Sequence, residues 1–274
     1  MKTIVVIATT VYVAFFAINL IFAGQSFAEI DPDAILGVWL LDEGKGDIAK
    51  DSSQNGNDGT LNKGPKWVDG KFGKALDFDG KDDYVEIPSS PLFNPKEFTV
   101  TFWMFPKAIG GNNPAGKGNS TLVVTNGNPG DGGGSNWWFE LWNGGNFEFK
   151  SCKPDCSAAS TPMNTPEKWY FVAGTYDGAN YGLYINGELK STGPNDVDAT
   201  PRGLLIGSGL CPAGHGCDGG YFKGIIDDVA MFNGVLSEDD IKSIMKRGLG
   251  LELGIAAVGP ANKLTAIWGS IKAR

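Results

Sequence analysis

Oxygen-bearing side chains that could bind a metal ion are concentrated in one short polar run. At nearly alternate positions the run carries carboxylate, hydroxyl and amide groups: Asp51, Ser53, Asn55, Asn57 and Asp58. The pattern partly matches the start of a calcium-binding loop, although the glutamate that completes a helical loop is missing. We therefore expect a structural Ca²⁺ ion that recruits further oxygens from elsewhere in the chain. A turn whose side chains bond their own backbone is the alternative.

Most of the aromatic and polar side chains that could bind a sugar lie in or next to the run 137–142, and Trp103 lies on an earlier strand. The apolar face of a sugar stacks on a flat ring, while its hydroxyl groups bond carboxylates and amides. Three tryptophans could supply the rings, and a carboxylate and an amide the polar groups: Trp138, Trp142, Trp103, Glu140 and Asn143. We expect these five residues to bind a ligand. The alternative is that each tryptophan belongs to the core or covers it.

The four cysteines form two local pairs, Cys152 with Cys156 and Cys211 with Cys217. Disulfides are the default for such pairs in an oxidising compartment, so we expect two small stapled loops. Sequence alone does not fix the connectivity, and cross-pairing between the loops stays open. A metal site that joins the cysteines with His215, the only histidine, is a further alternative.

Strands and turns are predicted along most of the chain, because short aromatic and β-branched runs alternate with Gly, Asn, Asp and Ser. In the strand 98–105, alternation places the even-numbered residues on the core face and Trp103 on the other face. In 137–142 the odd and even residues also separate, without indicating which set faces the core. The chain holds roughly ten or more such strands, which favours two stacked sheets.

Two short segments of the sequence each predict one particular local structure. Asn186-Gly187 predicts a tight hairpin, because both residues tolerate the positive φ that such a turn requires. Ser237 predicts a helix start, with Asp240 three residues on and apolar residues at helical spacing up to Gly248. The predicted class is all-β, an antiparallel two-sheet sandwich with one short C-terminal helix.

The two ends of the chain differ in composition from the strand-rich segment between them. An apolar run that ends near Gly24 precedes Ser26-Phe27-Ala28, which has the small-x-small form of a signal-peptidase site. We expect residues 1–28 to be a cleaved signal peptide, 29–248 one domain, and 249–274 a tail that serves attachment or sorting. An uncleaved membrane anchor is the alternative for the first segment. A simple extension packed along the domain is the alternative for the tail.

The net charge of the chain limits the classes of molecule that it is expected to bind. The formal net charge is -8. No cluster of basic residues could form a phosphate-binding stripe, which argues against nucleic acid as a partner. An acidic surface is typical of a protein that works outside the cell and of cation sites. We expect a secreted, cell-surface or periplasmic protein that has no membrane association once the signal is removed.

Several short pieces follow one another in a specific order between about Ile35 and Gly248. They are Trp39–Glu43, Asp51–Leu61, Gly73–Gly80, Asp83–Val85, Phe98–Trp103, Leu183–Gly187, Gly224–Val229 and Leu236–Ile241. Their succession resembles the laminin-G-like branch of the concanavalin A-like lectin and glucanase superfamily. The resemblance implies a jelly roll displayed outside the cell, often with a structural Ca²⁺ ion. It also implies that Glu43 near the first strand and Asp227 or Asp228 near the last join the calcium ligands.

The resemblance does not imply one ligand, because this fold hosts lectins, adhesion modules, spacers and hydrolases. Glucanases of the superfamily carry a Glu-x-Asp-x-x-Glu pattern on one strand, and that pattern is absent here. Glu140 and Glu148 lie on different predicted strands. A G-x-S-x-G motif is absent too. We therefore expect a non-catalytic, calcium-stabilised module that binds an extracellular glycan or a surface protein. A structural or adhesion module is the alternative, and a glycan hydrolase or lyase is the third hypothesis.

Overall fold

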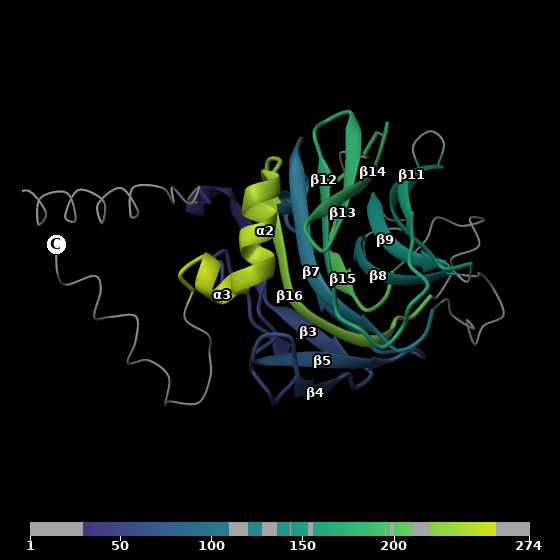
Figure 1. The fold of residues 1–274 in the computed structure, drawn as a ribbon. Helices are drawn as coiled ribbons and strands as arrows, with labels where there is room; N and C mark the ends of the chain where they lie inside the picture. The colour runs from purple at the N-terminus through teal and green to yellow at the C-terminus, as the bar shows by residue number, and fades with distance from the viewer. Residues whose placement is uncertain are drawn as a thin grey trace, which may run out of the picture. The chain divides into compact units, whose positions relative to one another are not determined.

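The computed structural model describes residues 30–109, 120–127, 136–142, 144–152, 156–194, 196–197, 200–209 and 220–255. The chain divides into two compact units, Met1–Ile30 and Asp31–Arg274, and the described residues belong almost entirely to the second. The expected signal peptide lies outside the described residues. Two antiparallel sheets of eight strands each form a sandwich in the second unit, which confirms the predicted fold class (Figure 1).

The first sheet, called sheet A, has the strand order β14-β13-β12-β7-β16-β5-β4, and β1 also pairs with β16. Its strands are β1 (Ile35–Trp39), β4 (Lys66–Asp69), β5 (Lys74–Asp79), β7 (Phe98–Pro106), β12 (Tyr170–Tyr176), β13 (Asn180–Ile185), β14 (Glu188–Pro194) and β16 (Lys223–Asn233). Strand β16, the last one among the described residues, therefore lies in the interior of this sheet, between β7 on one side and β5 and β1 on the other.

The second sheet, called sheet B, has the order β11-β10-β9-β8-β15-β6-β3-β2. Its strands are β2 (Ile48–Ala49), β3 (Gly59–Asn62), β6 (Tyr84–Ile87), β8 (Ser120–Asn126), β9 (Trp137–Trp142), β10 (Asn146–Cys152), β11 (Cys156–Pro162) and β15 (Leu204–Ile206). Strands β8 to β11 follow one another as a meander, so residues close in the sequence share one region of the sheet.

The core lies between the two sheets. Phe102 of β7 meets Phe139 of β9 at 5.0 Å between ring centroids, and Phe98 stacks on Trp137 at 5.3 Å. Even-numbered residues of β7 thus face inward, as predicted, and so do the odd-numbered residues of β9. Because successive side chains of a strand alternate between faces, Trp103 points to the outer face of sheet A. Residues 138, 140 and 142 point to the outer face of sheet B.

The two specific local signals are confirmed. Asn186 and Gly187 join β13 to β14 with φ values of 53° and 79°, the conformation that the hairpin signal predicts. Helix α2 (Glu238–Arg247) begins at Ser237, whose side chain and that of Asp240 form a capping box. Short helices η1 (Pro32–Ala34), η2 (Pro91–Phe93) and α3 (Leu249–Glu252) complete the described elements. Within the described residues, none of the helices has the length and apolar character needed to cross a membrane.

Strand β16 changes neighbours halfway along its length. Residues 223–226 pair with β5, and residues 229–232 pair with β1. The register against β7 shifts between Asp227 and Ala230, and Asp228 has a φ of 48°. This bulge brings two acidic residues to the point where β5 gives way to β1. In Figure 1, α2 and α3 lie on the side of β16 and β7, away from β8 and β9.

Candidate functional site

A cluster of aromatic and charged side chains covers the outer face of β9 and β10 in sheet B. Strand β9 supplies Trp138, Glu140 and Trp142 to this face. Across the hairpin, Glu148 of β10 is the register partner of Glu140, and Lys150 is the partner of Trp138. Directly opposite residues share a face and have Cβ atoms about 4.5–5.5 Å apart. We call these five residues the β9–β10 cluster.

Glu140 is the centre of the β9–β10 cluster. Its Oε1 accepts the indole N–H of Trp142 at 2.9 Å and lies 2.6 Å from the Lys150 ammonium. The side chain of Glu140 is fully buried, while Lys150 keeps 13% of its surface exposed and Trp142 is half-buried. Glu140 therefore fixes the orientation of the partly exposed Trp142 ring through a charge-assisted hydrogen bond.

Two buried polar atoms of the cluster lack partners among the described residues. They are Oε2 of Glu140, which is an acceptor, and Nε1 of Trp138, which carries a donor. An unpaired buried polar group costs about 1–3 kcal/mol, so a group that satisfies both atoms gains that free energy. The two residues are separated by one residue on β9 and share its outer face.

The Lys150 ammonium lies over both indole rings. It is 4.9 Å from the ring centroid of Trp142 and 5.7 Å from that of Trp138. A second carboxylate, that of Glu148, lies 3.5 Å from the same nitrogen. Rings, carboxylates and an ammonium group held in fixed positions are the groups that bind a sugar through stacking and hydrogen bonds. Sequence reasoning missed Lys150, although the Asn143-Gly144-Gly145 turn signal places it across from Trp138.

One of the other ligand-binding residues predicted from the sequence, Trp103, does not join this cluster. Trp103 lies on the outer face of sheet A, where it contacts Phe72 at 6.1 Å and Phe171 at 5.2 Å. Trp103 thus lies apart from Trp138 and Trp142, because β7 and β9 belong to different sheets, and its role in ligand binding stays a prediction. Asn143 lies outside the described residues.

The Asp51 loop is held by its own backbone. Oδ1 of Asp51 accepts the N–H groups of Val38 at 3.1 Å and Ser53 at 2.9 Å, and Oδ2 accepts that of Asn57 at 2.9 Å. The amide of Asn55 donates to the Ile35 carbonyl at 2.9 Å. The loop thus satisfies the edge of β1 that faces away from β16. These hydrogen bonds match the alternative given for this run, a turn whose side chains bond the backbone. A Ca²⁺ ion bound by Asp51 stays a prediction.

Acidic residues from distant parts of the chain meet at the end of β1. Oδ2 of Asp227 accepts the N–H groups of Lys71 at 2.7 Å and Phe72 at 2.9 Å, and Oδ2 of Asp228 accepts that of Leu249 at 3.0 Å. Asp42, whose charge acts on both Asp227 and Asp228, accepts the N–H of Lys74. Glu43, the next residue, accepts the N–H of Lys50 and lies near Asp58 of the Asp51 loop instead. We call Asp42, Asp227 and Asp228 the acidic corner. It joins β1, the β4–β5 turn, the β16 bulge and α3.

Burial and mutual repulsion shift the titration of the acidic corner. Burial raises the pKa of Asp227 to about 8, and the charge of Asp228 adds to this. Burial raises the pKa of Asp228 to about 7, with a further contribution from Asp42. The pKa values of Asp42 and Glu43 are also raised, mainly by burial. Oδ1 of Asp227 and Oε2 of Glu43 are buried without a hydrogen-bond partner among the described residues.

The acidic corner and the Asp51 loop lie on opposite edges of β1, since Val38 bonds Asp51 on one side and pairs with Ala230 on the other. The structure thus brings both ends of the domain to one region but does not place Asp51 with Asp227 around one point. Asn55 and Asn57 stay with Asp51 on the far edge.

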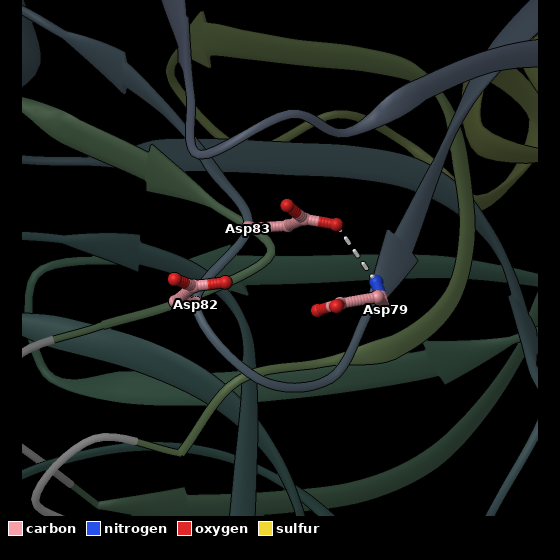
Figure 2. Close-up of side chains that lie close together, drawn as sticks. All are labelled: Asp79, Asp82 and Asp83. Atoms are coloured by element: carbon pink, nitrogen blue, oxygen red, sulfur yellow. Dashed lines mark hydrogen bonds between the residues drawn. The ribbon is translucent and has the colours of Figure 1, made fainter.

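A different acidic turn has the spacing that a metal ion requires. Asp79, Asp82 and Asp83, at the β5–β6 turn, place one carboxylate oxygen each within 4.8 Å of one another, and they form the one such group found among the described residues. Figure 2 shows the N–H of Asp79 donating to Asp83, at 3.0 Å. Burial raises the pKa of Asp83. This turn could hold a metal ion.

The cysteine predictions fall mostly outside the described residues. The backbones of Cys152 and Cys156 are opposite each other in the β10–β11 register. Their side chains, together with Cys211, Cys217 and His215, lie outside the described residues. The two stapled loops therefore stay a prediction.

One known protein family matches the sequence over much of the sandwich. A laminin-G-type family model, described as the Concanavalin A-like lectin/glucanases superfamily, matches residues 79–242. The chain belongs to this superfamily. Among curated proteins, none matches the sequence. The family match begins after the Asp51 loop and ends inside α2, so it covers most strands of the sandwich and the whole β9–β10 cluster.

Solved structures share the fold at low sequence identity. One is domain 4 of AbnA, a GH43 extracellular arabinanase of Geobacillus stearothermophilus in complex with arabinotriose. It is 21% identical, with a TM-score of 0.60, over 77% of this chain and 98% of that domain. The botulinum neurotoxin serotype D binding domain is 16% identical, with a TM-score of 0.57, over 78% of this chain. The binding domain of Paraclostridial Mosquitocidal Protein 1 is also 16% identical over 78% of this chain, with a TM-score of 0.60.

This superfamily member spans about half, 52%, of each of the two toxin chains that it matches. All three similar structures are named as binding domains or as a domain bound to a sugar. The likeness at these identities shows the fold, and the superfamily itself includes glucanases.

Proposed function

We propose that this chain is a non-catalytic carbohydrate-recognition module that acts outside the cell, as a secreted, cell-surface or periplasmic protein. The observation that carries the proposal is the hydrogen bond that fixes the Trp142 ring against Glu140, beside Lys150. A ring held in place before binding loses little conformational freedom when a sugar stacks on it. The arabinotriose bound to the similar arabinanase domain supports a glycan as the ligand class.

The proposal is tested by binding to immobilised and soluble glycans, with the mature domain and its Trp142→Ala variant. We expect Trp142→Ala to weaken binding at least tenfold while the thermal melt stays close to that of the parent. Tyr184→Ala is the matched control, because Tyr184 is a half-buried aromatic residue on β13 of sheet A. Equal retention of the parent and Trp142→Ala on every glycan that binds would overturn this site.

A structural or adhesion module that contacts a surface protein is the second candidate. The observation that favours it is the burial of Trp138, which is 1% exposed, and of Glu140 beside it. Buried side chains serve packing better than stacking on a ligand. If this candidate holds, the domain binds no glycan and is instead retained by a cell-surface protein, and Trp142→Ala changes neither property.

A glycan hydrolase is favoured by one observation only. Glu140 and Glu148 are register partners on one face, a relationship that the sequence left unseen. Paired carboxylates divide the acid and nucleophile roles in glycosidases. Here Lys150 bridges the pair, and Glu140 is fully buried. Release of reducing sugar by the parent, and its loss in Glu148→Gln, is the result that would establish catalysis.

We also propose that Ca²⁺ stabilises the fold, bound at the β5–β6 turn. Asp79, Asp82 and Asp83 support this site, because each brings a carboxylate oxygen within 4.8 Å of the others and Ca²⁺ takes carboxylate oxygens and offsets the repulsion between them. The acidic corner is the second candidate, since Oδ1 of Asp227 is buried there without a hydrogen-bond partner among the described residues. The Asp51 loop has a separate role, which is to hold the edge of β1 in place.

Thermal melts with millimolar Ca²⁺ and with a chelator test the ion, because a ligand that binds only the folded state raises the melting temperature. We expect Ca²⁺ to raise the melting temperature of the parent and Asp82→Asn to reduce that rise. Asp42→Asn is the control at the acidic corner. A rise that Asp42→Asn removes and Asp82→Asn leaves intact would move the ion to that corner, and no rise at all would refute the ion.

The chain would reach its place of action through residues 1–28 as a cleaved signal. The apolar run and the small residues before position 29 support this. The mass of the protein recovered from the exporting host tests it, because cleavage removes the first 28 residues and an anchor keeps them.

A further inference from the structure

The charges of the β9–β10 cluster do not balance. Two carboxylates, those of Glu140 and Glu148, share one ammonium group, that of Lys150, at 2.6 Å and 3.5 Å. The hydroxyl of Ser160 on β11 also donates to Glu148, at 3.4 Å. The cluster therefore carries one net negative charge on the outer face of sheet B.

The ammonium of Lys150 is already engaged. It contacts two carboxylates and lies over two indole rings, and 13% of the side chain is exposed. An anionic ligand would have to compete with these partners for Lys150. It would also bring its charge toward the two carboxylates, and like charges at close range repel strongly in a partly dry site.

The two unpartnered atoms of the cluster have complementary hydrogen-bonding roles. Trp138 Nε1–H can only donate, and Glu140 Oε2 can only accept. A hydroxyl group both donates and accepts, so one hydroxyl or two neighbouring ones can satisfy both atoms. A carboxylate or sulfate group offers acceptors alone and would leave Glu140 Oε2 facing another acceptor.

From these observations we infer that the β9–β10 cluster selects neutral, hydroxyl-rich glycans and rejects glycans that carry carboxylate or sulfate groups. The inference rests on the proposed glycan-binding function and narrows its ligand class. Glu140 has two roles in this scheme, because its Oε1 holds Trp142 and Lys150 in position and its Oε2 accepts from a ligand hydroxyl. Glu148 and Trp142 are the more exposed groups of the cluster.

The experiment compares matched neutral and anionic forms of the same sugar chains. Arabino-, galacto- and gluco-oligosaccharides are titrated into the mature domain, beside the same oligosaccharides with primary hydroxyls oxidised to carboxylates. We expect the neutral form to bind at least roughly tenfold more tightly at low salt, and the ratio to shrink at high salt as charges are screened. Glu148→Lys adds positive charge at the cluster and should reduce the ratio severalfold.

Asp239→Lys is the matched control, since it makes the same charge change at an exposed position of α2. It should leave the ratio unchanged. Tighter binding of the oxidised forms would overturn the inference and leave the glycan-binding function standing. A preference for neutral forms that Glu148→Lys does not alter would place the selectivity elsewhere and also overturn it. Binding of neither form, by a folded protein, is the separate failure of the proposed function.

Discussion

Glu140 and Trp142 are joined by a 2.9 Å hydrogen bond from the indole N–H to Oε1, although they lie on one strand with a single residue between them. Their side chains share the outer face of β9, and the same carboxylate binds Lys150 from β10. One buried charge thus sets the position of an aromatic ring and of a cation.

Removal of that charge should destabilise the domain. Glu140→Gln keeps the size of the side chain but leaves Lys150, 13% exposed, without its nearer carboxylate. We expect a loss of roughly 2–4 kcal/mol in the free energy of unfolding, because a buried ion pair is broken and Lys150 keeps only its longer contact with Glu148. Urea unfolding measures it. Glu188→Gln breaks the exposed pair with Lys190 and should change nothing measurable, and equal effects of the two variants would contradict the role of Glu140.

The packing between the sheets predicts a second effect. A Cβ atom at Gly174 of β12 would collide with the rings of Phe139 and Phe149. Those two rings stack with centroids 4.3 Å apart and have little room to move. Gly174→Ala should cost roughly 1–3 kcal/mol through overpacking. Gly144→Ala is the control, because a Cβ there meets nothing within 4 Å. If Gly174→Ala were as stable as the parent in denaturant, the core side chains would have moved to accommodate the added methyl group.

The acidic corner predicts how stability varies with pH in chelated buffer. Unfolded carboxyl groups titrate near pH 4, whereas Asp227 and Asp228 titrate at about 8 and 7 in the folded domain. Between these limits the folded state holds more protons than the unfolded state. The two carboxyl groups therefore contribute their full stabilisation below pH 4, and this stabilisation is lost as the pH rises through 7 and 8. Unfolding free energies from pH 5 to 9 should fall accordingly.

Asp228→Asn should flatten this pH dependence and stabilise the domain at pH 8.5. Asparagine can still accept the Leu249 N–H, and it tolerates the φ of 48° found at this position. Asp239→Asn, on the exposed face of α2, should keep the slope of the parent. A parent whose stability is level from pH 5 to 9 would rule out the buried protonated carboxyls.

A substitution of Asp51 distinguishes a structural role of this residue from an ion-binding role. Asp51→Ala removes the acceptor of three backbone N–H groups and should cost roughly 3 kcal/mol, with Ca²⁺ and with chelator alike. The exposed neighbour Asp47 provides the control, Asp47→Ala, which should be close to neutral. A loss that is seen only when Ca²⁺ is present would identify Asp51 as a ligand of the ion instead.

Much of the fold follows from local patterns in the sequence. The two-residue period of β7 predicted its inward face, the Asn186-Gly187 turn predicted its hairpin, and the Ser237 cap predicted α2. These signals involve neighbours in the chain, and tertiary contacts do not override them here.

The site was less accessible to sequence reasoning, because it depends on which strands become neighbours. Trp103 and Trp138 have the same residue type and similar strand contexts, yet the chain order puts β7 in sheet A and β9 in sheet B. Glu140 and Glu148 could have been paired from the turn between β9 and β10, since a short hairpin sets the register. Local patterns do not indicate the acidic corner, because Asp42 and Asp228 are distant in the sequence; only the family resemblance placed Asp227 or Asp228 near the end of the first strand.

The place of β16 inside sheet A sets when this domain can fold. Strands β1, β5 and β7 are made early in synthesis, but each pairs with β16, which begins only at Lys223. Sheet A therefore cannot be completed until β16 has left the ribosome, whereas all strands of sheet B are made before it. Contacts across such long separations make folding slow. Strand β16 thus completes sheet A after the strands on both of its sides have been synthesised.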